Sequence, residues 1–141
     1  MAFSDYDKYD GIGLGQLIKK KKVSALELVD EAIARIEKHH PKLNAVIYKT
    51  YDQARAAAKK KLPDGPFKGV PFLLKDIMAF QTGVPTRQGS GYIPATPGDH
   101  DSAMTRRFFA SGLISLGKTN VPEFGLLPVT ESTLYGPARN P

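Results

Sequence analysis

The clearest pattern of hydrophobic and polar positions lies in residues 23–40, and it is helical. Val29, Ala32, Ile33 and Ile36 follow the i, i+3, i+4 and i+7 spacing that places side chains on one face of a helix. Charged residues occupy most of the positions between them. This segment is therefore predicted to be an amphipathic helix with one face in a core.

Both ends of this helix carry local signals. Ser24 and Glu27 have the spacing of a capping box, and Val23 and Leu28 have that of a hydrophobic staple. The helix is expected to end at His39-His40-Pro41, where the two histidines would complement the helix dipole. Adjacent positions on a helix diverge, so this pair is not expected to bind a metal together.

Weaker patterns predict the remaining elements. Helices are predicted over residues 10–20, 51–61 and 102–111, and strands over 44–48, 69–75 and 113–118. Asp101 or Ser102 would cap the third of these helices, and Asn120 with Glu123 would cap a short turn. The tail over 130–141 is polar and turn-rich and is expected to end without a closing helix or strand.

The order of strand, helix and strand between residues 69 and 118 predicts an α/β fold. Two strands joined through a helix normally run parallel and are connected by a right-handed crossover. No internal repeat or linker divides the chain, so the 141 residues are expected to form one domain.

A long glycine- and proline-rich loop is predicted at about 78–101, between a strand and a helix. Loops of this length in compact domains are usually functional or disordered. This one leaves the carboxyl end of a strand, where open α/β sheets bind their ligands. We interpret it as an active-site loop, with a surface loop as the alternative.

Composition narrows the class of protein. The chain has no cysteine, which excludes disulfides and cysteine nucleophiles and favours a reducing cytoplasm. It lacks the order of a signal peptide and any apolar run long enough to span a bilayer. The net charge is +6, but the lysine runs at 19–22 and 59–61 fall at predicted helix ends. We therefore expect neither nucleic acid nor membrane as a partner.

Two lysines are candidates for chemistry, because Lys75 and Lys118 each end an apolar strand, which is expected to bury them where water is scarce. Burial disfavours the ammonium form, and a neutral lysine can take a proton from a nucleophile. On spacing alone the two are equivalent, and a lysine at a strand end usually just extends to solvent. Asp76 follows Lys75 but should point to the opposite face, so it need not neutralise that lysine.

Other polar clusters give weaker signals. Asp99-His100-Asp101 is more typical of a helix start than of a metal site. Gly89-Ser90-Gly91 lacks the outer glycines of a Gly-x-Ser-x-Gly elbow. No metal or other cofactor is predicted, and the residues by themselves give no complete catalytic set.

Longer motifs carry a resemblance to a known family. GVPFLLKD at 69–76, TRQGS at 86–90, DHDSAMTRRFFASGLISLGKTNVPEFG at 99–125 and TESTLYGPARNP at 130–141 resemble the amidase signature family. The segment VSALELVDEAIARIEKHHPKLNAVI at 23–47 is similar to the family's N-terminal region. The stretch 121–141 looks most like bacterial amidases of the 6-aminohexanoate-cyclic-dimer hydrolase type. It looks less like the glutamyl-tRNA amidotransferase A subunit, which usually has aspartate where Pro122 stands.

The resemblance implies a fold and a mechanism. The fold would be the N-terminal portion of the amidase signature fold, with helices packed on an incomplete mixed sheet. In this family a serine attacks an amide carbonyl, and a second serine in a cis peptide relays its proton to a lysine. Lys75 matches that lysine by its place in GVPFLLKD. The implied substrate is a small-molecule amide whose identity the sequence leaves open.

The chain departs from the family in lacking both serine motifs. In the family these motifs follow the Asn-Pro that is Asn140-Pro141 here, and none of the serines present falls in either one. The serines are Ser4, Ser24, Ser90, Ser102, Ser111, Ser115 and Ser132. We therefore expect an N-terminal fragment of an amidase that is inactive alone. The alternatives are half of a split amidase completed by a C-terminal chain, or a self-associating interaction module from a decayed enzyme.

Overall fold

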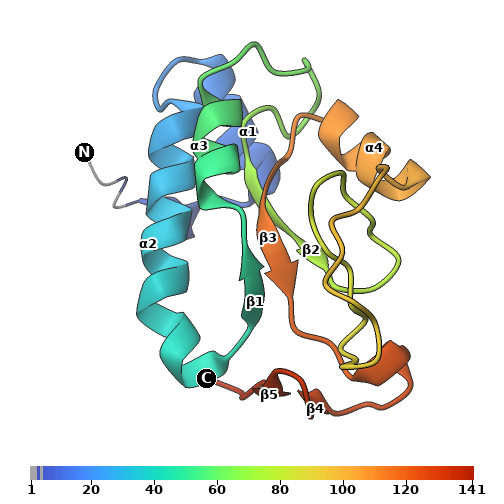
Figure 1. Cartoon of the computed structure of the whole chain (residues 1–141). Coiled ribbons are helices and arrows are strands. Elements are labelled where there is room, and N and C mark those ends of the chain that lie inside the picture. Colours follow the sequence, from blue (N-terminus) through green and yellow to red (C-terminus); the bar gives the residue numbers. More distant parts are fainter. Residues whose placement is uncertain (1–2, 4) are drawn as a thin grey trace. The chain divides into compact units, whose positions relative to one another are not determined.

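The structure is a computed structural model that describes residues 3 and 5–141. The α-helices of these described residues are α1 (Gly11–Lys19), α2 (Ala25–Leu43), α3 (Tyr51–Ala58) and α4 (Ala103–Ala110). Its strands are β1 (Val46–Lys49), β2 (Pro71–Lys75), β3 (Ile114–Thr119), β4 (Glu131–Ser132) and β5 (Gly136–Pro137) (Figure 1). Two short 3-10 helices cover Tyr6–Lys8 and Glu123–Gly125. The predicted α/β class is confirmed.

The contacts divide the chain into two compact units. The first unit comprises Met1–Lys38, Thr50–Phe72 and Arg107–Leu116. The second unit comprises His39–Lys49, Leu73–Arg106 and Gly117–Pro141. That the 141 residues belong to a single amidase domain stays a prediction.

The first unit is built around the N-terminal end of α2. Ser24 N donates to the Glu27 carboxylate at 2.9 Å, and Glu27 N donates to Ser24 Oγ at 3.2 Å, so the predicted capping box is present. Val23 and Leu28 are both buried in one apolar cluster with Leu14 and Val70. The local sequence signals thus place the start of α2 directly on the core of this unit.

Helix α3 lies alongside α2 within the first unit (Figure 1). Arg55 Nε donates to Asp30 at 2.7 Å, and the Tyr51 hydroxyl donates to Glu37 at 2.7 Å. Burial raises the pKa of Tyr51, and the Glu37 carboxylate beside it adds to that shift. Each pair joins one residue of α2 to one of α3, so polar contacts fix the alignment of the two helices.

The main sheet has the order β1-β3-β2 and is mixed. Strands β1 and β3 are antiparallel, with Tyr48 opposite Lys118. Ile114 N donates to Val70 O at 2.9 Å and Asp76 N donates to Thr119 O at 3.3 Å, a sense that makes β2 and β3 parallel, as predicted. Because β3 is the central strand, five of its six residues are buried, whereas β2 buries only Leu74.

One glycine is required by the pairing of β1 with β3. Gly117 has a φ of 146°, and a Cβ there would run into the carbonyl oxygen of Tyr48 on β1. The close approach of the two backbones is open only to a residue without a side chain.

Three local predictions are wrong. Helix α2 continues through Pro41 to Leu43, because Asn44 N donates to His40 O and Asn44 itself takes the left-handed conformation that ends the helix. The tail is not free of strands, since β4 pairs with β5 as a two-residue antiparallel ladder.

The third error concerns the turn after β3. Glu123 does not return to Asn120 as a capping box; its carboxylate accepts from Thr133 N at 3.0 Å. The Asn120 amide group instead donates to Asn44 O and Gly136 O. These contacts tie the turn, the end of α2 and the terminal hairpin together within the second unit.

Candidate functional site around the ends of strands β2 and β3

Lys75 is the last residue of β2, and its side chain is exposed. Asp76 follows with only 1% of its surface exposed, so the two side chains point to opposite faces, as predicted. The expectation that the strand would bury Lys75 is wrong for the described chain. Successive side chains of a strand face opposite sides, and the side that Lys75 faces is left open by the described residues, whereas its neighbours Leu74 and Asp76 are buried.

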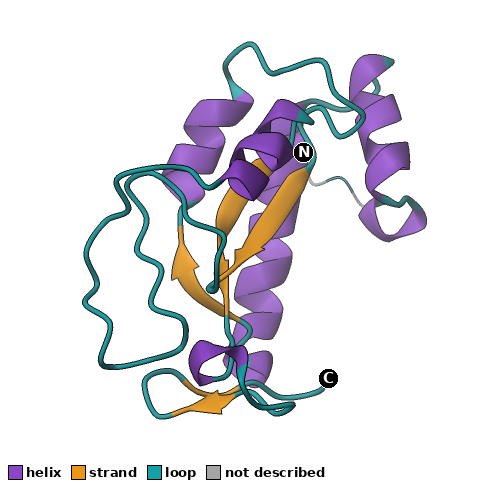
Figure 2. Ribbon diagram, turned by 90° about the vertical axis from the view of Figure 1, so that its right-hand side faces the viewer, coloured by secondary structure: helices purple, strands orange, loops and turns teal. Residues whose placement is uncertain are grey.

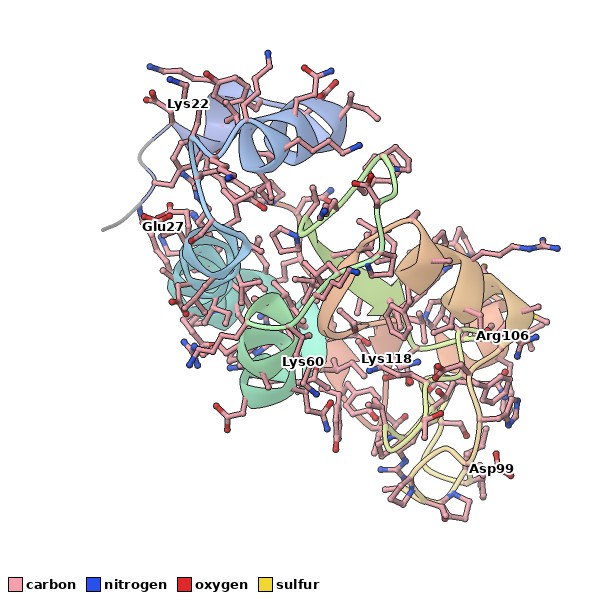
Figure 3. All side chains as sticks on the ribbon, turned by 90° about the horizontal axis from the view of Figure 1, so that it is seen from above. Lys22, Glu27, Lys60, Asp99, Arg106 and Lys118 are labelled. Carbon is pink, nitrogen blue, oxygen red and sulfur yellow. The ribbon has the colours of Figure 1, made fainter. Side chains whose placement is uncertain are left out.

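Lys118, the other candidate, is the buried one, with 0% exposure. Its Nζ donates to the carbonyl oxygen of Ala79 and, at 3.1 Å, to Thr86 Oγ1. Burial lowers the pKa of Lys118 to about 8, while the nearby Asp76 carboxylate opposes that shift. Figure 3 shows Lys118 in the interior of its unit, whereas Asp99 projects from the loop.

The Asp76 carboxylate is held by two backbone amides of the long loop. Arg87 N donates to Oδ1 at 3.1 Å and Gly89 N donates to Oδ2 at 3.3 Å. Burial raises the pKa of Asp76, and these two hydrogen bonds together with the charge of Lys118 oppose the shift. Both carboxylate oxygens are therefore occupied by the loop.

The loop between β2 and α4 contains neither a helix nor a strand among the residues described (Figure 2). It is nevertheless tied internally: Arg87 Nε donates to Ile93 O at 2.8 Å, and Thr82 N donates to Asp101 at 2.7 Å. The cap of α4 is Ser102, whose Oγ accepts from Thr105 N at 3.2 Å. The loop is fixed by polar contacts at both ends, in keeping with a built site more than with a free surface loop.

A cavity of about 540 Å³ opens beside this loop. It is lined by Ser90, Gly91, Tyr92, Glu123, Thr133 and Leu134. Ser90 is buried and its Oγ accepts from Tyr92 N, while Tyr92 itself is 97% exposed. The loop and the terminal hairpin thus share one hollow of the second unit.

The remaining candidates lie apart from this arrangement. His100 Nδ1 lies 2.6 Å from Asp99, and the His100 ring stacks on Phe80, so the cluster stabilises its own loop. No three acidic or histidine side chains of the described chain gather closely enough to hold a metal ion. No described helix has the length and apolar character needed to cross a membrane.

Sequence reasoning did not assign any role to Asp76, Thr86 or Arg87 in this site. Asp76 was considered only as a neighbour of Lys75, although its place at the end of an apolar strand was a signal of burial. The motif at residues 86–90 carries the family resemblance, and its spacing gives no sign of this contact. That its backbone and side chains close around Asp76 and Lys118 depends on the path of the loop.

Comparisons with known proteins identify the family. The family profile described as Amidase matches residues 27–141. This chain belongs to the amidase signature family. The predicted resemblance and the N-terminal portion of the amidase fold are both confirmed.

The curated relatives of this chain in the amidase family are much longer than the chain itself. It is 36% identical over 138 residues to 6-aminohexanoate-cyclic-dimer hydrolase from Paenarthrobacter ureafaciens, covering 94% of this chain and 27% of the relative. It is 41% identical over 133 residues to the A subunit of glutamyl-tRNA(Gln) amidotransferase from Gloeothece citriformis, covering 89% and 27%. The chain therefore spans about a quarter of the length of the curated relatives that it matches.

A solved structure agrees with these alignments. The 6-aminohexanoate cyclic dimer hydrolase complexed with substrate superimposes with a TM-score of 0.87 and 34% identity, over 94% of this chain and 27% of that one. The identity is high enough for the likeness to reflect family membership as well as fold.

Proposed function

We propose that this chain is the N-terminal part of an amidase that hydrolyses the C–N bond of an amide, and that Lys75 is its general base. The serine nucleophile and the relaying cis serine would come from polypeptide outside these 141 residues. The observation that carries the proposal is the place of Lys75: it is the lysine of the amidase-like motif 69–76, at the carboxyl end of β2 with its amine exposed.

The proposed mechanism needs an amine that can lose its proton. The relaying serine would give its proton to Lys75, which makes the nucleophilic serine reactive towards the amide carbonyl. Backbone N–H groups near the nucleophile would stabilise the oxyanion. Since the described residues leave Lys75 exposed, the water exclusion that favours a neutral amine would also come from the rest of the enzyme.

The 141 residues by themselves would lack the proposed serine nucleophile. Loss of a serine nucleophile in a comparable triad lowers the rate on the order of 10⁶-fold. We therefore infer that the 141 residues alone have no detectable amidase activity. We also infer a cytoplasmic location, because a chain without cysteine forms no disulfide that would require an oxidising compartment.

A chimera provides the test. This chain would replace the matching N-terminal segment of the Paenarthrobacter ureafaciens relative, and hydrolysis of that relative's cyclic amide would be measured. The expected result is an active chimera that K75A inactivates by 10⁴-fold or more, on the order of a lost base in a triad. The matched control K61M changes another exposed lysine and should leave the rate unchanged.

Two further measurements complete this test: a control for the junction and an assay of the isolated chain. The relative's own N-terminal segment, rejoined at the same boundary, shows that the junction permits activity. If that control is active while the chimera with this chain is dead, or if K75A leaves the chimera active, the proposal fails. Hydrolysis by the isolated 141 residues would contradict the inference that they are inactive alone.

The second candidate is a split enzyme, in which a separate C-terminal chain binds this chain non-covalently, and one observation favours it. Apolar side chains of the segment 124–129 are exposed in the second unit: Phe124, Leu126, Leu127 and Val129. Such a surface suits a complementing C-terminal chain that completes the amidase. Co-expression of the two parts as separate chains, followed by co-purification and assay, distinguishes this split enzyme from a single polypeptide.

A further inference from the structure

We propose that Asp76 and Lys118 form a positioning pair for Lys75: together they hold the loop segment 79–89 against the ends of β2 and β3 and so fix the direction in which Lys75 leaves its strand. The meaning of this for catalysis rests on the proposed function. The clamp itself is a property of the 141 residues and can be measured without any activity.

Asp76 connects Lys75 to the loop directly. Its backbone N donates to Thr119 O on β3, which ties the peptide unit just after Lys75 to the sheet. Its carboxylate accepts from the amides of Arg87 and Gly89, which lie more than ten residues further along the chain. One residue thus joins the end of β2 both to the neighbouring strand and to the returning loop.

Lys118 holds the same loop from the other strand. Its Nζ donates to Ala79 O, at the outgoing side of the loop, and to Thr86 Oγ1, at the returning side. The side chain is fully buried, so no water competes for these bonds. The four anchor points on the loop, at Ala79, Thr86, Arg87 and Gly89, are therefore shared between one acid and one base.

The charges of the two residues make them a unit. Each is buried, and a buried charge without an opposite charge nearby is strongly destabilising. The negative charge of Asp76 favours the ammonium form of Lys118, and the positive charge of Lys118 favours the carboxylate of Asp76. Removing either residue leaves the charge of the other without its opposite charge nearby.

The arrangement also explains why Lys118 is not the base itself. Two of the three N–H donors of its ammonium are directed at the loop, and its side chain has no exposed surface from which to reach a substrate. Lys75 has the opposite properties: an exposed side chain on a backbone that the pair holds still. In this proposal the buried Lys118 holds the loop in place, and the exposed Lys75 takes part in the reaction.

Amide hydrogen exchange of the 141-residue chain tests the clamp. In D76N one carboxylate oxygen is replaced by an amide nitrogen, which cannot accept a hydrogen bond. The amide of Arg87 or Gly89 should then exchange at least tenfold faster than in the unchanged chain. K118M should accelerate hydrogen exchange at both amides, because it removes the bonds to Ala79 and Thr86 and leaves the charge of Asp76 without an opposite charge nearby.

Controls separate local release from unfolding. The amides of Leu28 and Gly69, which donate to Ser24 O and Gly112 O in the first unit, report on global unfolding and should keep their rates. K61M, at an exposed lysine, should change none of these amides. If K118M does not fold, D76N alone decides. Exchange at Arg87 and Gly89 within twofold of the unchanged chain in a folded variant overturns the clamp.

The catalytic meaning is tested in the active chimera. Misplacing a catalytic group by about 1 Å costs on the order of 100-fold. We expect D76N and K118M to lower kcat by about that factor with KM within threefold, measured per folded enzyme. Faster exchange with unchanged kcat overturns the positioning role. A chimera inactive with every version of this chain, beside an active control, defeats the proposed function and leaves the exchange result standing.

Discussion

Lys118 has no exposed surface, and its amine lies among loop oxygens and near the Asp76 carboxylate. Burial and charge act on it in opposite directions, and burial is the larger effect. Lys75, at the end of the edge strand β2, is left to solvent. At the scale of single residues, the two strand-end lysines therefore differ in environment: Lys118 is buried and Lys75 is exposed.

The lowered pKa of Lys118 predicts a pH dependence of stability. Between pH 8 and its ordinary pKa of 10.5 the unfolded chain binds more protons than the folded chain, so the free energy of unfolding should rise with pH. The rise attributable to Lys118 is about 3 kcal/mol, since a tenfold change in proton affinity corresponds to about 1.4 kcal/mol. Comparison of the free energy of unfolding in urea at pH 7 and at pH 9.5 measures most of this rise.

K118M is the control for that pH dependence. It removes the titrating amine, while the neighbouring charged and titratable groups, Asp76, Arg87 and Tyr135, remain. The difference in stability between the original chain and K118M should therefore grow with pH over this window. An equal pH slope in both chains would show that Lys118 is not the titrating group.

Lys75, in contrast, should contribute little to stability and much to catalysis. Since its side chain is exposed, K75A is expected to change the free energy of unfolding by no more than about 0.5 kcal/mol. The same substitution should abolish acylation in the active chimera. Chemical denaturation and single-turnover kinetics on one preparation check both, and a loss of stability above about 2 kcal/mol would mean that Lys75 is structural.

At the scale of elements, local signals located most helices and strands. The capping box, the staple and the apolar spacing of α2 act within a few residues of one another, so the sequence alone predicts where this helix begins. Its end was misjudged because Asn44 and His40, not Pro41, terminate it through contacts with β1 and the backbone. Asn120 was misjudged because its side chain bonds a distant hairpin.

The capping box gives a prediction at this scale. S24A removes the acceptor for Glu27 N and should lower the free energy of unfolding by about 1 kcal/mol, whereas S24T keeps the hydroxyl and should lose less. Bonds from Ser24 also lower the pKa of Glu27 from 4.5. That contribution is present above pH 4.5 and is lost as the pH falls, so the effect of S24A measured by thermal unfolding should shrink in acid.

At the scale of the whole molecule, the chain holds about a quarter of the length of its amidase relatives. Its second unit exposes apolar side chains over 124–129, the surface that we propose is covered by further polypeptide. The family assignment could be predicted from the sequence because long motifs recur in order. The substrate could not, because the motifs identify the family and assign no residue of this chain to a substrate pocket.

We predict that this segment binds the rest of the amidase. L126S/L127S replaces two exposed leucines and should leave the free energy of unfolding within about 0.5 kcal/mol. The affinity for a separately expressed C-terminal part should fall at least tenfold, because apolar area is lost from the contact. Titration calorimetry measures it, and L62S, a half-buried leucine outside the segment, is the matched control for losing a leucine elsewhere. Unchanged affinity in L126S/L127S would remove the segment from the interface.

By itself, the sequence determined the elements whose causes are local, the α/β class and the amidase family, and it named two lysines at strand ends without separating them by spacing. Only the tertiary structure decided which lysine is buried. The loop after β2 returns to Lys118 and contacts its amine through Ala79 and Thr86, whereas Lys75 projects from the opposite face of its strand to the buried Asp76. Burial depends on what lies beside a strand, and that is a property of distant segments brought together, not of the residues within the strand.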